Sequence, residues 1–206
     1  FLGEASPAVD SGMVIVPYSS GELVALKVEN GQVLWRDSLT GNRRSRSTTT
    51  LSSIRGRPVI DRGIVIAISN SGQIAAINLR TGRRIWDRAI GGIESPWVAG
   101  GFIFFLTNDS ELVAMARRTG RIHWVQPLPQ WEDLEDKTGR IIWTGPVLSS
   151  DRLIVAGSSG AALSISPYTG TILGKVKMPD GVTIGPVAAG NTLYFLSDDA
   201  DLVAYR

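Results

Sequence analysis

The sequence contains no cysteine and a single histidine, His123. Without cysteine, the chain can form neither disulfides nor cysteine-ligated metal centres, and it has no thiol nucleophile. A lone histidine excludes metal sites built from several imidazoles, and no nucleophilic serine motif accompanies it. Since His123 directly precedes Trp124 in a predicted strand, we expect His123 to have a structural role and not a chemical one.

Long apolar runs and helical periodicity are also missing. No run approaches the roughly 20 apolar residues that a helix needs to cross a bilayer, and no segment sustains apolar residues at positions i, i+3 and i+4. Short alternating apolar runs separated by Gly, Asn, Asp and Ser recur instead, and this pattern predicts an all-β protein. The net charge of +2 is too small to indicate a nucleic-acid partner.

One repeat occurs five times along the chain. Each copy begins with a proline and has an apolar or small residue 16 positions later. The first four copies have a glycine 24 positions after the proline, and the first three have a tryptophan four positions beyond that glycine. Constant spacing within five copies indicates a repeat architecture in which each copy is one supersecondary unit. The five prolines are Pro7, Pro58, Pro96, Pro146 and Pro186.

Each repeat is predicted to form a four-stranded sheet, with glycine providing the positive φ of the third turn. A single sheet cannot bury both of its faces, so the copies are predicted to pack together as the blades of a β-propeller. In the second repeat the strands cover roughly 57–61, 63–69, 73–79 and 83–89. The tryptophans expected to be buried between blades are Trp35, Trp86 and Trp124.

The blades differ in completeness and in the connections between them. The blade cores are predicted at 7–39, 58–90, 96–128, 146–178 and, incompletely, 186–206. Two long inserted loops separate blades, at 40–57 and 129–145. The fifth repeat has room for three strands, and the residues before Pro7 are too few to provide the fourth. We expect four complete blades and three strands of a closing blade, with a missing N-terminal half of the propeller providing the remainder.

The segments SSGELVALKVENGQVLW (19–35) and NSGQIAAINLRTGRRIW (70–86) resemble the repeats of PQQ-like, quinoprotein-type β-propellers. Within that class the whole chain resembles the C-terminal portion of the BamB family. The features that carry this resemblance are the opening GEASPAV (3–9), the long insertion before Pro58 and the ending ADLVAYR (200–206).

The resemblance implies a non-catalytic scaffold without a cofactor. The BamB family is a lipoprotein subunit of the outer-membrane β-barrel assembly (BAM) machinery, on the periplasmic face of the bacterial outer membrane. The resemblance also implies an eight-bladed ring, with any signal peptide and lipidated cysteine upstream of Phe1. Membrane attachment would then occur only through that upstream anchor, and no nucleic acid is expected as a partner.

The predicted partner-binding site lies in the connections between blades, because every insertion falls there and function gathers where loops vary. The resemblance implies docking onto the periplasmic domains of the barrel-assembly protein through two consecutive connections. Phe1-Leu2 stands before GEAS where the family has a Leu-x-Leu-Arg run, and Ser53 and Arg55 stand where it has a spaced aspartate pair. An arginine-rich insertion then predicts pairing with carboxylates of the partner. The predicted surface comprises Phe1, Leu2, Arg43, Arg44, Arg46, Ser53 and Arg55.

Several features of the sequence allow more than one interpretation. The arginine insertion, which Arg57 and Arg62 extend, is a protein-binding loop or a solvated surface, with phosphate binding as a third reading. In the 129–145 insertion, Trp131 and Trp143 are interface anchors among acidic residues or covers for a blade edge. SDDAD (197–201) is a turn or a carboxylate cluster for calcium. The alternatives for the whole chain are a different PQQ-like protein-binding propeller or a quinone-dependent dehydrogenase.

Overall fold

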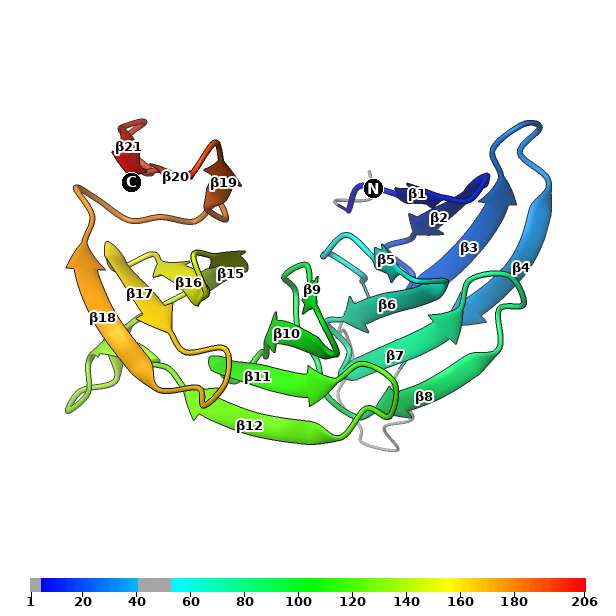
Figure 1. Ribbon diagram of the computed structural model, residues 1–206. Helices are drawn as coiled ribbons and strands as arrows, with labels where there is room; N and C mark the ends of the chain where they lie inside the picture. The colour runs from blue at the N-terminus through cyan, green and yellow to red at the C-terminus, as the bar shows by residue number, and fades with distance from the viewer. Residues whose placement is uncertain (1–4, 41–52) are drawn as a thin grey trace. The chain divides into compact units, whose positions relative to one another are not determined.

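The computed structural model describes residues 5–40 and 53–206, and every regular element in those two ranges is a β-strand (Figure 1). The prediction of an all-β chain built from four-stranded antiparallel sheets is therefore confirmed. No helix that is long and apolar enough to span a membrane occurs in the described part of the chain.

The first two sheets follow the chain order without crossovers. The first sheet, in the order β1-β2-β3-β4, consists of β1 (Ala8–Asp10), β2 (Met13–Pro17), β3 (Glu22–Lys27) and β4 (Val33–Ser38). The second sheet, in the order β5-β6-β7-β8, consists of β5 (Val59–Asp61), β6 (Ile64–Ser69), β7 (Gln73–Asn78) and β8 (Arg84–Arg88).

The remaining sheets repeat this arrangement. The third consists of β9 (Trp97–Ala99), β10 (Phe102–Leu106), β11 (Glu111–Ala116) and β12 (Ile122–Pro127). The fourth consists of β15 (Trp143–Ser149), β16 (Arg152–Gly157), β17 (Ala161–Ile165) and β18 (Ile172–Lys177). The fifth has three strands, β19 (Val187–Ala189), β20 (Thr192–Leu196) and β21 (Leu202–Tyr205).

The chain divides into two compact units. The first comprises Phe1–Phe102 and Ala116–Arg121, and the second comprises Ile103–Met115 and Ile122–Arg206. In the first unit the inner strands β6 and β7 are almost entirely buried, whereas the outer strand β8 buries mainly its tryptophan. Strands that are buried on both faces require continuous apolar runs, which explains why IVIAIS and QIAAIN lack a polar face.

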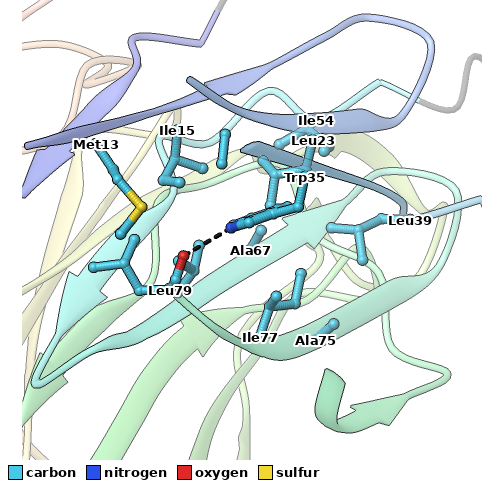
Figure 2. Close-up of a cluster of buried hydrophobic side chains, with 12 residues drawn as sticks. Met13, Ile15, Leu23, Trp35, Leu39, Ile54, Ala67, Ala75, Ile77 and Leu79 are labelled. Atoms are coloured by element: carbon cyan, nitrogen blue, oxygen red, sulfur yellow. Dashed lines mark hydrogen bonds between the residues drawn. The ribbon is translucent and has the colours of Figure 1, made fainter. Parts of the chain in front are cut away.

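One hydrophobic cluster joins the first and second sheets inside the first unit (Figure 2). Met13, Ile15 and Trp35 come from the first sheet, and Ala67 and Ile77 come from the second. Trp35 is 8% exposed, and its indole Nε1 donates a hydrogen bond of 2.7 Å to the backbone carbonyl of Leu79. The tryptophan thus fills the space between two sheets and satisfies its one polar group there.

The same junction recurs twice. Trp86 Nε1 donates to the carbonyl of Arg117 at 2.7 Å, and Trp124 Nε1 donates to the carbonyl of Pro167 at 3.0 Å. Trp86 is 7% exposed, as predicted for a residue between blades, while Trp124 is only half-buried. Each ring also lies against a turn glycine of the next repeat, so tryptophan and glycine of successive copies form one contact.

The 129–145 insertion differs from the predicted loop. It contains a two-stranded hairpin, β13 (Trp131–Asp133) and β14 (Thr138–Arg140), and β15 already begins at Trp143, before the predicted core boundary at Pro146. The strand starts early because Trp143 and Thr144 pair with Gly157 and Ala156 before the register shifts at the Gly145-Pro146 bond. The inserted segment is therefore largely ordered by strand pairing.

Candidate functional site: the connections between sheets

The connections between consecutive sheets lie at the same end as the turns between second and third strands. In the first unit, the β6–β7 turn binds both neighbouring connections. Asn70 N–H donates to the carbonyl of Ser53 at 2.9 Å, and Gly92 N–H donates to the carbonyl of Ser69 at 3.2 Å. Ser69 Oγ donates to the carbonyl of Leu39 at 2.8 Å. These bonds hold two successive connections on one surface.

The segment that enters β5 alternates between core and solvent. Ile54 is 2% exposed and belongs to the cluster between the first and second sheets. Gly56 and Pro58 are also buried, whereas Arg55 and Arg57 are exposed. Because side chains alternate along extended chain, burying Ile54, Gly56 and Pro58 forces the two arginines onto the solvent side. The sequence thereby fixes two cations at the start of the second sheet.

A close backbone contact joins this segment to the next connection. A Cβ atom added at Gly56 would lie 2.5 Å from the carbonyl oxygen of Glu94, so only glycine fits. Arg57 N–H donates to Ser95 Oγ at 2.8 Å. Between the two segments is a cavity of about 250 Å³, lined by Arg55, Gly56, Ile93, Glu94 and Ser95. The site is therefore a small polar hollow bordered by two connections.

The structure describes only part of the predicted partner-binding set. Ser53 is half-buried and Arg55 is exposed, and both lie in the segment that enters β5. Arg57, Glu94 and Ser95 join them, and of these the sequence interpretation had included only Arg57. The residues that lie outside the described ranges are Phe1, Leu2, Arg43, Arg44 and Arg46.

Arg62 does not belong to this surface. It occupies the turn between β5 and β6 with a φ of 47°, whereas Arg55 and Arg57 precede β5. A three-residue strand separates the two positions, which places Arg62 at the other end of the sheet. The expectation that Arg62 extends the arginine group was wrong, because closeness in sequence was counted without the intervening strand.

The second unit has its own inserted connection, the hairpin of β13 and β14. Trp143 is 6% exposed and donates from Nε1 to the carbonyl of Pro129 at 2.7 Å, so its buried ring ties β15 to the start of the inserted segment. Trp131 is half-buried at the base of the hairpin. The tip is solvent-exposed, with Leu134 73% exposed and Asp133 Oδ1 accepting the backbone N–H groups of Glu135 and Asp136. This is a charged surface hairpin that keeps one apolar residue at its tip.

The other chemical candidates lie on a strand and in a turn. His123 is exposed on β12. The SDDAD segment forms the turn between β20 and β21, in which Asp201 N–H donates to Ser197 Oγ at 3.0 Å and Thr183 Oγ1 donates to Asp198 Oδ1 at 2.6 Å. Among the described residues, no group of three or more His, Cys, Asp or Glu side chains is arranged to hold a metal ion.

A family model and two curated relatives similar to this chain carry the same name. A family model described as outer membrane protein assembly factor BamB matches residues 1–126, more than half of the chain. The protein of that name from Shigella dysenteriae serotype 1 is 28% identical over 198 residues, which are 96% of this chain and 48% of the relative. The protein from Escherichia coli K12 is 27% identical over 198 residues, with the same shares. The chain thus spans about half the length of these curated relatives.

Solved structures agree on the fold. The crystal structure of BamB from Moraxella catarrhalis superposes with a TM-score of 0.83 at 22% identity, covering 99% of this chain and 59% of that one. The computationally designed protein Ika8 gives a TM-score of 0.70 at 17% identity, covering 97% of this chain and 57% of that one. At such identities the likeness concerns fold alone, and membership rests on the family match. By that match, the chain belongs to the family of the outer membrane protein assembly factor BamB.

Proposed function

We propose that this chain is part of a non-catalytic scaffold in outer-membrane β-barrel assembly, held at the periplasmic face of that membrane. The name shared by its relatives describes an assembly factor rather than an enzyme, which supports this role. We further propose that it docks onto the periplasmic domains of the barrel-assembly protein through the connections between its sheets.

The docking proposal rests on the contact between two successive connections of the first unit, the segment that enters β5 and the segment between β8 and β9. Exposed Arg55 and Arg57 stand on a backbone that is fixed by the Gly56–Glu94 contact and by the bond from Arg57 N–H to Ser95 Oγ. Because the backbone is held in place, little conformational entropy is lost there on binding. Two guanidinium groups presented on one side match carboxylates of a partner surface.

Charge reversal at these positions tests the proposal. In the full-length protein, Arg55→Glu/Arg57→Glu is expected to weaken binding to the periplasmic domains of the cognate barrel-assembly protein by at least about tenfold, since like charges would then face each other. Both side chains are exposed, so the melting temperature is expected to change by only a few degrees at most. Binding is measured by biolayer interferometry at two salt concentrations.

The matched control is Arg80→Glu/Arg83→Glu. These two arginines are also exposed and border the turn between β7 and β8, at the opposite end of the second sheet. The control makes the same change in net charge, so a general electrostatic effect would weaken both variants equally. Equal affinity of the Arg55/Arg57 variant and the unmodified protein would remove this surface from the interface.

A further inference from the structure

Two of the turns between third and fourth strands carry the same sequence, Arg-Thr-Gly-Arg, at 80–83 and 118–121. In all four described turns of this type, the glycine N–H donates to the backbone carbonyl four positions earlier at 2.8 or 2.9 Å, and the glycine φ lies between 63° and 76°. The first and fourth turns reach this geometry with Glu-Asn-Gly-Gln (29–32) and Tyr-Thr-Gly-Thr (168–171). The turn therefore does not require arginine, and the folding of the repeat leaves the arginines of the two middle turns unexplained.

The two arginine turns and the turn between β5 and β6 lie together in the first unit. Leu79 N–H donates to the carbonyl of Gly63 at 2.9 Å, which joins the β7–β8 turn to the β5–β6 turn. The buried side chain of Arg117 forms an ion pair with Asp61, which joins the β5–β6 turn to the β11–β12 turn. All three turns belong to the same compact unit. They present five exposed arginines, called here the arginine face: Arg62, Arg80, Arg83, Arg118 and Arg121.

The arginine face has little acidic charge to compensate it. Asp61 is the only acid in the three turns, and its charge is already neutralised by Arg117, whose side chain is 8% exposed. Within residues 5–40 and 53–206, none of the five exposed arginines forms an ion pair. The face ends at the first sheet, whose equivalent turns carry Asp10 and Glu29. Five unpaired cations on one surface create a positive potential that attracts an anionic partner.

The composition of the arginine face favours a phospholipid surface over a protein or a nucleic acid. The segments 61–63, 79–83 and 117–121 contain no aromatic residue, and their one large apolar side chain, Leu79, is 2% exposed. Protein interfaces rely on aromatic and other large anchors that become buried, and single-stranded nucleic acids stack on aromatic rings. An anionic bilayer needs neither, because long arginine side chains reach its phosphates from a solvated surface.

We propose that the arginine face binds the anionic phospholipid headgroups of the membrane beside which the protein is held. The guanidinium groups of the two Arg-Thr-Gly-Arg turns pair with phosphates there. The second sheet then stands with this end toward the bilayer and with Arg55 and Arg57 at the end away from it. The inference rests on the proposed location at the membrane, and it uses a different surface from the proposed docking site.

Binding to vesicles tests the partner class, with the full-length protein prepared without any attached acyl chain. Vesicles of phosphatidylethanolamine with about 25% phosphatidylglycerol are compared, by co-sedimentation, with neutral vesicles of phosphatidylethanolamine and phosphatidylcholine. Because each basic residue near an anionic surface raises partitioning about fivefold, we expect at least about 20-fold stronger binding to the anionic vesicles at low salt. That binding should be lost at about 0.5 M salt, where charges are strongly screened. Equal binding to both kinds of vesicle, or binding to neither, would overturn the proposal.

Two substitutions, one in each turn, test the surface. Arg80→Gln/Arg118→Gln is expected to weaken binding to the anionic vesicles at least about tenfold, whereas Arg80→Lys/Arg118→Lys, which keeps the charge, should stay within about threefold of the unmodified protein. The matched control is Lys175→Gln/Lys177→Gln, which makes the same change in net charge at exposed positions of strand β18 and should also stay within about threefold. Equal losses in the two glutamine variants would show a general effect of net charge and would remove the arginine face from the membrane contact.

Binding to the isolated periplasmic domains of the barrel-assembly protein, without vesicles, separates this proposal from the docking proposal. Arg80→Gln/Arg118→Gln should bind those domains as the unmodified protein does. If this variant instead loses affinity for the domains and keeps its affinity for the vesicles, the arginine face is a protein interface and the phospholipid proposal is wrong. Failure of the docking proposal would appear only in the domain-binding assay and would leave the vesicle results unchanged.

Discussion

At the scale of single residues, the turn glycines Gly31 and Gly82 share one reason to be glycine, and Gly82 has a second. Its φ is positive, 70° at Gly31 and 68° at Gly82, which any side chain disfavours. Gly82 also lies beneath the tryptophan of the preceding repeat, so an added Cβ would come within 2.6 Å of Trp35 Cγ. At Gly31 an added Cβ meets nothing within 4 Å. The two glycines therefore separate the conformational cost of a side chain from its steric cost.

Alanine at these two positions measures both costs. Gly31→Ala is expected to lower the free energy of unfolding by about 1 kcal/mol, the cost of a left-handed conformation. Gly82→Ala is expected to lower it by a further 1 to 3 kcal/mol or so, because the ring of Trp35 must move in a packed junction. Urea denaturation of the full-length protein, followed by tryptophan fluorescence, gives both values. Equal losses in the two variants would show that the tryptophan adapts at no cost.

At the scale of elements, the outer strands of neighbouring sheets are held together by a bidentate ion pair in addition to the core. Arg84 on β8 donates from Nε and Nη2 to the carboxylate of Asp37 on β4, at 2.8 and 2.9 Å. Its Nη2 also donates to the carbonyl of Ser38 at 2.5 Å. The hydrogen bond to Asp37, ahead of the Coulomb attraction, raises the pKa of Arg84 above its already strongly basic value. Near neutral pH this contribution is fully present, because Arg84 stays protonated, and on the basic side it is lost only as the pH rises through that raised pKa.

A double-mutant cycle measures this link between β4 and β8. Arg84→Lys removes the bidentate geometry, Asp37→Asn removes the charge, and the coupling is expected to be about 0.5 to 1 kcal/mol, since both side chains are partly exposed. The coupling should not change between pH 7 and pH 9, because Arg84 stays protonated throughout. The control pair is Lys27 and Glu29, whose side chains are 43% and 74% exposed, and it should show no measurable coupling. If the coupling between Arg84 and Asp37 is as weak as that of the control pair, the hydrophobic core alone holds the two sheets together.

The sequence predicts an element well when the contacts that form it lie within one repeat, and poorly when they join distant segments. The four-stranded sheets and the burial of Trp35 and Trp86 follow from spacing within one repeat, because a fixed register brings each residue to an equivalent place. The hairpin of β13 and β14 carries no repeat signal, and neither does the contact of Gly56 with Glu94, which lies 38 positions along the chain. Contacts between connections depend on tertiary packing, so the sequence could point to the connections but not to the contacts that shape the candidate site.

At the scale of the whole molecule, the two compact units each have a core, but the fifth sheet leaves one strand with an open side. Within the described residues β21 pairs with β20, and its other edge has no partner strand. Ser197 N–H donates to the carbonyl of Asp201, and since hydrogen-bonded pairs alternate along an antiparallel ladder, the pairs at Val203 and Tyr205 bond inward. The N–H groups of Leu202 and Ala204 therefore face outward. A short uncharged strand with outward N–H groups is a template for another strand.

The 206-residue chain expressed alone is expected to self-associate through β21, and Ala204→Pro should reduce that association because it removes an outward N–H group without breaking a bond to β20. Ala204→Ser, which keeps the N–H group, is the control and should associate as the unmodified chain does. In a longer polypeptide whose upstream half provides a closing strand, the same Ala204→Pro change should instead lower the melting temperature by several degrees, because the N–H group is then paired. Light scattering and thermal unfolding give the two readouts. The prediction fails if the 206-residue chain is a monomer that unfolds in one cooperative transition and if Ala204→Pro changes neither its association nor its melting temperature. β21 would then be protected by some other means, and no further strand would be needed to complete the fifth sheet.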